Sequence, residues 1–85
     1  MANYRIEIKK SAQKEILNLP QQDLKRVVAK IHQLATNPRN PDSKKLTSLE
    51  QYRVRVGPYR ILYEIHDQVL LVVVVRVANR KEAYR

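Results

Sequence analysis

The chain has 85 residues, enough for one domain with a modest core, and it has no cysteine, which excludes a disulfide framework and a thiolate metal site. Its 17 lysines and arginines against 8 aspartates and glutamates give a formal charge of +9, which favours nucleic acid as the first partner and an acidic protein as the second. The longest apolar run, residues 69–75, is too short to cross a bilayer, and residues 1–20 lack a signal-peptide pattern, so we expect a cytoplasmic protein without a membrane partner.

The chain begins with the patterns of a strand and a short helix. Tyr4, Ile6 and Ile8 alternate with charged residues, which is the period of a strand. Ser11 predicts the N-cap of a short helix, and Pro20 ends it because proline disfavours the helical conformation in the residue before it.

Residues 21–36 carry the strongest helical signal in the chain. Their apolar side chains recur at the i, i+3, i+4, i+7 spacing of one helix face. These apolar positions are Leu24, Val27, Val28, Ile31, Leu34 and Ala35. The tight connection before residue 21 predicts that the two helices run antiparallel, and residues 38–49 then form a connector rich in turn formers.

Residues 52–65 predict a β-hairpin with two chemically different faces. Gly57-Pro58 supplies the turn, and apolar residues occupy every second position on either side of it. These apolar residues are Tyr52, Val54, Val56, Tyr59, Ile61, Tyr63 and Ile65. Since side chains two positions apart in a strand share a face, the hairpin has one apolar face and one charged face.

The charged face of the hairpin carries Arg53, Arg55 and Arg60. Three guanidinium groups so close repel one another unless an anion lies among them, which makes this face a candidate phosphate site. A solvated charged face is the common alternative for an antiparallel strand. A merely soluble face usually mixes signs, however, and only Glu50 and Glu64 lie nearby.

Residues 69–77 are almost wholly apolar, which is typical of a strand buried on both faces. We therefore expect the central strand of the sheet here, with Val73 at its middle. Leu24, Val28 and Ile31 of the second helix are expected to pack over Val73.

The order of elements, β-α-α-β-β-β, predicts a single α+β domain over residues 1–85. Two amphipathic helices need one apolar surface, and a sheet with one apolar face supplies it. We expect a two-layer domain in which both helices cover one face of a mainly antiparallel sheet and the arginines lie on the open face.

The signatures of common metal, cofactor and nucleotide sites are missing. A single glycine excludes a Gly-rich phosphate loop, and His32 and His66 lie in no metal-ligand pattern, so the sequence predicts no metal site and no cofactor. A set of cations and one phenol remains: Arg53, Arg55, Arg60, Arg80, Lys81 and Tyr84. Guanidinium groups can stabilise the extra charge of a phosphorane-like transition state, and in RNA the 2′-hydroxyl of the substrate can be the nucleophile.

The order of elements and three motifs resemble the RelE/ParE toxin superfamily of type II toxin–antitoxin systems, on the RelE side. The motifs are Tyr52-Arg53-Val54-Arg55-Val56, Gly57-Pro58-Tyr59-Arg60-Ile61-Leu62-Tyr63 and Arg80-Lys81-Glu82-Ala83-Tyr84. The resemblance covers nearly the whole chain. It implies a metal-independent endoribonuclease, an mRNA interferase, that cuts mRNA in the ribosomal A site by attack of a 2′-hydroxyl on the adjacent phosphate and so inhibits translation.

The resemblance also implies roles for individual residues. The implied catalytic residues are Arg53, Arg55, Arg60, Arg80 and Tyr84, and the implied substrate-binding residues are Lys44, Lys45 and Lys81. Arg53 and Arg55 match the strand pair that orients the nucleophile and assists proton transfer, and Arg60 matches the arginine that stabilises the phosphate. Arg80 matches a tail arginine near the leaving group, and Tyr84 matches a tyrosine that stacks on the substrate base. The implied partners are the ribosome and mRNA, a RelB-like antitoxin with an acidic toxin-binding segment, and operon DNA bound through the antitoxin complex.

Two features depart from the pattern of the superfamily. The strand pair is often lysine in relatives and is arginine here, and arginine, with a pKa above about 12, is a poor general base. Acid–base work then falls to Lys81, to Tyr84 or to ribosomal RNA, or the reaction is slower. Asn79 stands where relatives often have histidine, which removes one candidate acid.

Two other functions are compatible with this chemistry. ParE-like members of the superfamily poison DNA gyrase and are not nucleases, although the joint presence of Arg60, Arg80 and Tyr84 favours the nuclease. A non-catalytic nucleic-acid-binding module is the second alternative, because basic charge alone is enough for binding to a phosphate backbone.

Overall fold

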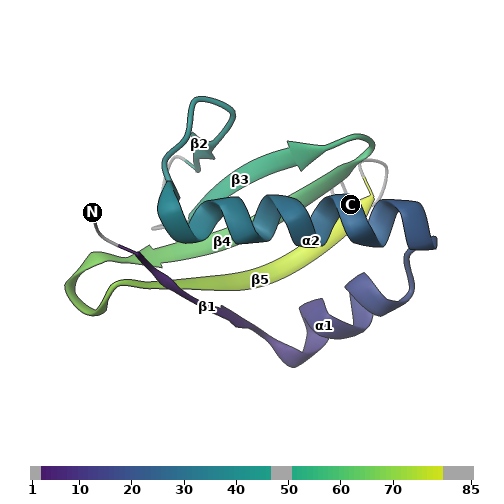
Figure 1. Ribbon diagram of the computed structural model, residues 1–85, viewed down its shortest axis with the longest axis horizontal. Coiled ribbons are helices and arrows are strands. Elements are labelled where there is room, and N and C mark those ends of the chain that lie inside the picture. The colour runs from purple at the N-terminus through teal and green to yellow at the C-terminus, as the bar shows by residue number, and fades with distance from the viewer. Residues whose placement is uncertain (1–2, 47–50, 80–85) are drawn as a thin grey trace.

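The computed structural model describes residues 3–46 and 51–79. Its elements are β1 (Arg5–Ile8), α1 (Lys10–Leu17), α2 (Gln21–Thr36), β2 (Lys44–Lys45), β3 (Gln51–Val56), β4 (Tyr59–His66), a 3₁₀ turn (Asp67–Val69) and β5 (Leu71–Asn79). Figure 1 shows the long strands side by side with α2 lying across them. Neither of the described helices is long and apolar enough to cross a membrane.

The five strands form one sheet in the order β1-β5-β4-β3-β2. β1 runs parallel to β5, and every other neighbouring pair is antiparallel. The predicted α+β architecture with a mainly antiparallel sheet is therefore confirmed. β2, which lies in the predicted connector, is an addition to that prediction, because two successive lysines carry no apolar alternation.

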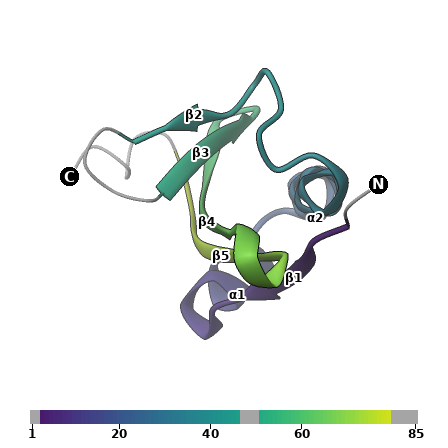
Figure 2. The ribbon, with the colours of Figure 1, turned by 90° about the vertical axis from the view of Figure 1, so that its left-hand side faces the viewer.

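The two helices cover different parts of the sheet, with α1 near β5 and β1 in Figure 2. α2 lies over one face, and in Figure 1 α1 runs in roughly the opposite direction toward the start of α2, as the short connection predicts. α1 packs beside β5 beyond the end of β1, where Glu15 Oε1 accepts a hydrogen bond from the Val77 N–H at 2.9 Å. This bond satisfies a backbone donor on a strand edge that β1 leaves uncovered. Ser11 lies inside α1 and is not its N-cap, because the helix begins at Lys10 with Lys9 in the cap position.

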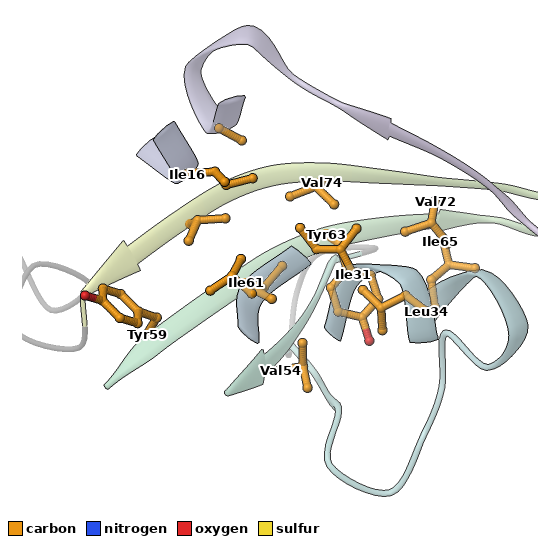
Figure 3. Packing of buried hydrophobic residues seen from close by; sticks show 13 residues of the cluster. Ile16, Ile31, Leu34, Val54, Tyr59, Ile61, Tyr63, Ile65, Val72 and Val74 are labelled. Atoms are coloured by element: carbon orange, nitrogen blue, oxygen red, sulfur yellow. The ribbon is translucent and has the colours of Figure 1, made fainter. Parts of the chain in front are cut away.

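One cluster of buried side chains joins both helices to the sheet (Figure 3). Its largest fully buried members are Tyr63, Leu34, Ile61, Val27, Val54, Val72 and Val74. Burying a branched aliphatic side chain contributes about 1.5–3 kcal/mol, so this one cluster supplies the main stabilising free energy of the domain. The cluster occupies the helix side of the sheet, which leaves the arginines on the other side.

The predicted position of Val73 is wrong. Val73 pairs with Glu64 of β4 and Glu7 of β1 on the face without helices, and it is only half-buried. Val72 and Val74 point to the helix side and are fully buried. A continuous apolar run does not indicate which of its residues face the core. A strand with one face in water has the same sequence pattern when that face also carries aliphatic residues.

The limits of this strand also differ from the prediction. β5 begins at Leu71, because Val69 belongs to the 3₁₀ turn and Leu70 takes a left-handed conformation with φ 50°. The third of the five strands in the sheet is β4, and β5 is its neighbour. The prediction that residues 69–77 form the central strand, buried on both faces, is therefore wrong in both respects.

Candidate functional site

The hairpin of β3 and β4 places its three arginines on one face. Gly57 has φ +55° and the ring of Pro58 fixes a negative φ, the sign pattern of a type II′ turn, whose twist suits a two-residue hairpin. This turn sets Arg55 directly opposite Arg60, and Arg53 follows two residues before Arg55 on the same face. We call this side of the sheet the arginine face.

A groove of about 390 Å³ opens on the arginine face. It is lined by Asp42, Lys44, Arg53 and Arg55, and we call it the arginine groove. Lys44 enters because β2 pairs with β3 and sets Lys44 opposite Arg53. Three cations against one carboxylate make the groove a place where a phosphate backbone can bind.

The second predicted lysine of β2 does not join this groove. Lys45 pairs with Tyr52, so the register places it on the opposite face of the strand from Lys44. Its predicted role in substrate binding therefore has no support from the geometry of the arginine groove.

Arg60 differs from the other two arginines in its burial. Only 5% of Arg60 is exposed, whereas Arg55 is exposed and Arg53 is half-buried. Arg60 lies on the central strand with Arg55 opposite on one side and Ala78 on the other. A guanidinium already withdrawn from water needs little solvent reorganisation to meet developing negative charge, which is the requirement for electrostatic stabilisation of a transition state.

The remaining predicted site residues, Arg80, Lys81 and Tyr84, lie outside the described residues. The last described residue of β5 is Asn79, which stands opposite Tyr59. The roles of the three tail residues therefore stay predictions from the resemblance.

Glu64, the acid of β4 on the arginine face, is engaged with its own neighbours. Glu64 Oε1 lies 3.1 Å from His66 Nε2, and Glu64 Oε2 accepts a hydrogen bond from Gln51 Nε2 at 3.5 Å. Glu64 and Arg60 are four residues apart on the same strand, about 13 Å at the usual rise. Glu64 therefore does not neutralise the arginine pair at the turn.

A set of hydrogen bonds that the sequence does not predict joins the loop after α2 to the end of the sheet opposite the Gly57-Pro58 turn. Arg39 donates to both carboxylate oxygens of Asp67 at 3.0 and 2.8 Å and to the Tyr52 hydroxyl at 3.1 Å. Tyr4 donates to the same carboxylate at 2.7 Å. These bonds lower the pKa of Asp67 to about 2 and raise the pKa of Arg39 and of Tyr4. No sequence period links these four positions, because each comes from a different element.

A family model and a relative of known name both match nearly the whole chain. The family model described as ParE toxin of type II toxin-antitoxin system, parDE, matches residues 6–84. The chain is 33% identical over 86 aligned positions, 96% of each chain, to a protein of Methanocaldococcus jannaschii described as a candidate RelE1 toxin.

Two solved structures extend the similarity to the fold. The toxin–antitoxin complex RelBE2 from Mycobacterium tuberculosis matches with a TM-score of 0.84 and 29% identity, over 93% of this chain and 100% of that chain. The RelE–RelB complex from Pyrococcus horikoshii matches with a TM-score of 0.83 and 25% identity, over 92% and 96% of the two chains. Together with the family match over nearly the whole length, these relatives establish that the chain belongs to the RelE/ParE superfamily of type II toxin–antitoxin systems, as a RelE-like toxin.

Proposed function

We propose that this toxin is a ribosome-dependent endoribonuclease that cleaves mRNA in the ribosomal A site and so inhibits translation in the cytoplasm. The observation that carries the proposal is the pair of arginines at the turn, Arg55 opposite a buried Arg60, beside a groove lined by Lys44 and Arg53. A row of cations with one buried guanidinium suits a phosphodiester whose charge increases in the transition state.

The proposed reaction needs no nucleophile from the protein. The 2′-oxygen of one ribose attacks the adjacent phosphorus, the bond from phosphorus to the 5′-oxygen breaks, and the products carry a 2′,3′-cyclic phosphate and a 5′-hydroxyl. The 2′-hydroxyl loses its proton and the leaving 5′-oxygen gains one. We assign charge stabilisation to Arg60 and positioning of the strand to Arg53, Arg55 and Lys44.

The proton transfers are assigned to groups outside the arginine groove. Arginine side chains do not readily give up a proton, so Arg53 and Arg55 are poor bases. Lys81, Tyr84 or ribosomal RNA would then take part in proton transfer, with Arg80 near the leaving group and Tyr84 stacked on the base. These tail assignments rest on the resemblance alone.

We also propose that a RelB-like antitoxin neutralises this toxin. The structures from Mycobacterium tuberculosis and Pyrococcus horikoshii are complexes of RelE-type toxins with their antitoxins. The formal charge of +9 on 85 residues favours an acidic toxin-binding segment in that partner. Through the antitoxin, the complex would bind the DNA of its own operon.

Primer extension on mRNA after induction of the toxin tests the nuclease. We expect new 5′ ends inside translated codons, and we expect them to disappear when translation is blocked before the A site is filled. Purified toxin with programmed ribosomes should yield the 2′,3′-cyclic phosphate end. Intact mRNA in both assays would contradict the proposal.

One observation favours a second function. The matching family model is named for ParE, and ParE-like members of the superfamily poison DNA gyrase. Inhibition of gyrase supercoiling by purified toxin, with intact mRNA in the same cells, would establish that function in place of the nuclease.

A further inference from the structure

One wall of the arginine groove comes from a part of the chain with little regular structure. Asp42 belongs to the loop 37–43, which joins α2 to β2, and Lys44 belongs to β2 itself. β2 has two residues and lies at the edge of the sheet, paired with β3 alone. So short an edge strand is not stable by itself, and the loop before it must help to hold it in place.

A buried tyrosine of the central strand holds both ends of this loop. Tyr63 is fully buried, and its hydroxyl lies 2.6 Å from the Pro38 carbonyl oxygen and 2.6 Å from Ser43 Oγ. A carbonyl can only accept, so the phenol donates to Pro38 and the Ser43 hydroxyl donates to the phenol oxygen. Burial raises the pKa of Tyr63, which keeps the phenol protonated and able to donate at neutral pH.

The loop transmits this anchoring to the groove. Asn40 Oδ1 accepts a hydrogen bond from the Asp42 N–H at 2.9 Å, and the Asn40 carbonyl accepts one from the Ser43 N–H at 2.9 Å. Asp42 and Ser43 therefore move with the Asn40 turn, and Lys44 follows Ser43 directly. A shift of Ser43 away from Tyr63 displaces the side of the groove that carries Lys44.

Other described contacts of the loop are more exposed. Lys30 and Asp42 form an ion pair at 3.3 Å, but the Asp42 side chain is 74% exposed. The side chains of Arg39 and Asp67 are 45% and 54% exposed. Exposed ion pairs contribute little and are screened by salt, so the hydrogen bonds of the buried Tyr63 give the loop its firmer attachment.

We propose that Tyr63 is a positioning residue, whose hydroxyl latches the loop 37–43 and thereby fixes Lys44 against Arg53 in the arginine groove. The inference rests on the proposed function, because it assigns the latch to a groove that binds an RNA backbone. Tyr63 itself would touch neither phosphate nor base. Its ring stacks against Tyr52 with 5.8 Å between centroids, so Tyr63→Phe removes the latch and keeps the packing.

Amide hydrogen exchange tests the latch without RNA. In Tyr63→Phe we expect exchange at Ser43 N–H and Leu46 N–H to accelerate by about tenfold or more, since both amides are bonded only within this loop and its junction with β3. The matched control is Tyr59→Phe, which removes the hydrogen bond from Tyr59 to Asp23 at 3.0 Å, at the other end of the sheet. The control should leave both amides as in the wild type.

Coupling to Lys44 tests the link to the groove. The probe is a short single-stranded RNA with 2′-O-methyl groups, which cannot be cleaved. Lys44→Gln should weaken its binding by about threefold in the wild type and in Tyr59→Phe, the order expected for one phosphate contact. In Tyr63→Phe the same change should have almost no effect, a result that a general loss of stability would not produce.

Each outcome decides between the alternatives. Unchanged exchange at both amides in Tyr63→Phe would overturn the latch. Faster exchange together with a full effect of Lys44→Gln in that variant would overturn its role in the groove. If exchange responds as expected but the wild-type toxin does not bind the RNA, the role of the groove in holding an RNA backbone fails and the latch on the loop stands, while primer extension judges the nuclease separately.

Discussion

Among the individual residues, Arg60 combines a charge with almost complete burial. Its exposed fraction of 5% comes from a central strand with a neighbour on either side, a position that the hairpin pattern does not reveal. Burial gives Arg60 two possible effects on mutation, because its replacement removes the charge that we propose acts in the reaction and also disturbs the packing of the sheet. Loss of activity and loss of stability must therefore be measured separately.

Replacement of Arg60 by alanine should slow single-turnover cleavage on programmed ribosomes by about a hundredfold, the usual effect of losing one donor to transition-state charge. Arg60→Lys should recover only part of the rate, since an ammonium group cannot reproduce the guanidinium fork. The matched control is Arg76→Ala on β5, because Arg76 pairs with Glu15 at 3.4 Å outside the groove. Thermal melts of all three variants separate folding from chemistry, and a fully active, folded Arg60→Ala protein would remove Arg60 from the mechanism.

Asp67 should make stability depend on pH in acid. The Arg39 guanidinium holds the folded-state pKa of Asp67 at about 2, below its ordinary value of 3.8. A carboxylate with a lowered pKa in the folded state stabilises the fold at pH values above its ordinary pKa. This contribution is lost as pH falls from about 4 to about 2. Urea unfolding at several pH values should show a shallower acid slope for Asp67→Asn than for the wild type. A wild-type slope in Asp67→Asn would show that the Arg39 guanidinium does not stabilise this carboxylate.

At the scale of elements, β5 shows that a sequence can predict a strand without predicting which of its side chains face the core. A strand forms over residues 71–79, close to the predicted 69–77, but Leu71, Val73, Arg76 and Ala78 lie on the arginine face. The pairing with β4 sets this phase, and it contains an irregularity between Leu62 and Tyr63. Pairing partners distant in sequence thus decide which valines are buried.

A matched pair of valine substitutions checks that orientation. Val74→Thr places a hydroxyl in the fully buried cluster and should lower the free energy of unfolding by about 1–3 kcal/mol. Val73→Thr should change it little, because Val73 is half-buried on the arginine face and threonine is favourable in strands. Urea denaturation measures both. Equal losses for the two variants would contradict the assigned register.

For the whole molecule, net charge and its distribution govern association more than fold. A charge of +9 would steer the acidic antitoxin segment that we propose toward the toxin over distances of the order of a Debye length, about 10 Å at 0.1 M salt. Short-range apolar contacts would then keep the complex together, and such contacts depend little on salt.

The association rate of the toxin with its antitoxin should therefore fall steeply as salt rises, while the dissociation rate changes little. A Lys14→Gln, Lys25→Gln double variant, with two exposed helix charges removed, should associate more slowly at low salt and like the wild type at high salt. Stopped-flow mixing at several ionic strengths measures both rates. An association rate independent of salt would show that charge does not steer this partner.

The sequence by itself determined the features that depend on local period and local conformation. Residues 21–36 form the helix that their apolar spacing predicts, and Gly57-Pro58 makes the turn that sets Arg53, Arg55 and Arg60 on one face. These follow from neighbours a few positions apart, so the amino-acid order contains them directly. The family resemblance could also be detected from the sequence, because its motifs are short continuous segments at the hairpin and at the end of the chain.

Only the tertiary structure decided which residues from distant parts of the chain are neighbours. It brought Lys44 opposite Arg53, turned Lys45 to the other face, buried Arg60 and anchored the loop 37–43 on Tyr63. Each of these depends on pairing or packing between elements far apart in the chain, where no period in the sequence specifies the partner. The three arginines were therefore predictable as a set, whereas the groove that Arg53 and Arg55 line and the hydrogen bonds of Tyr63 to the loop depend on the tertiary structure.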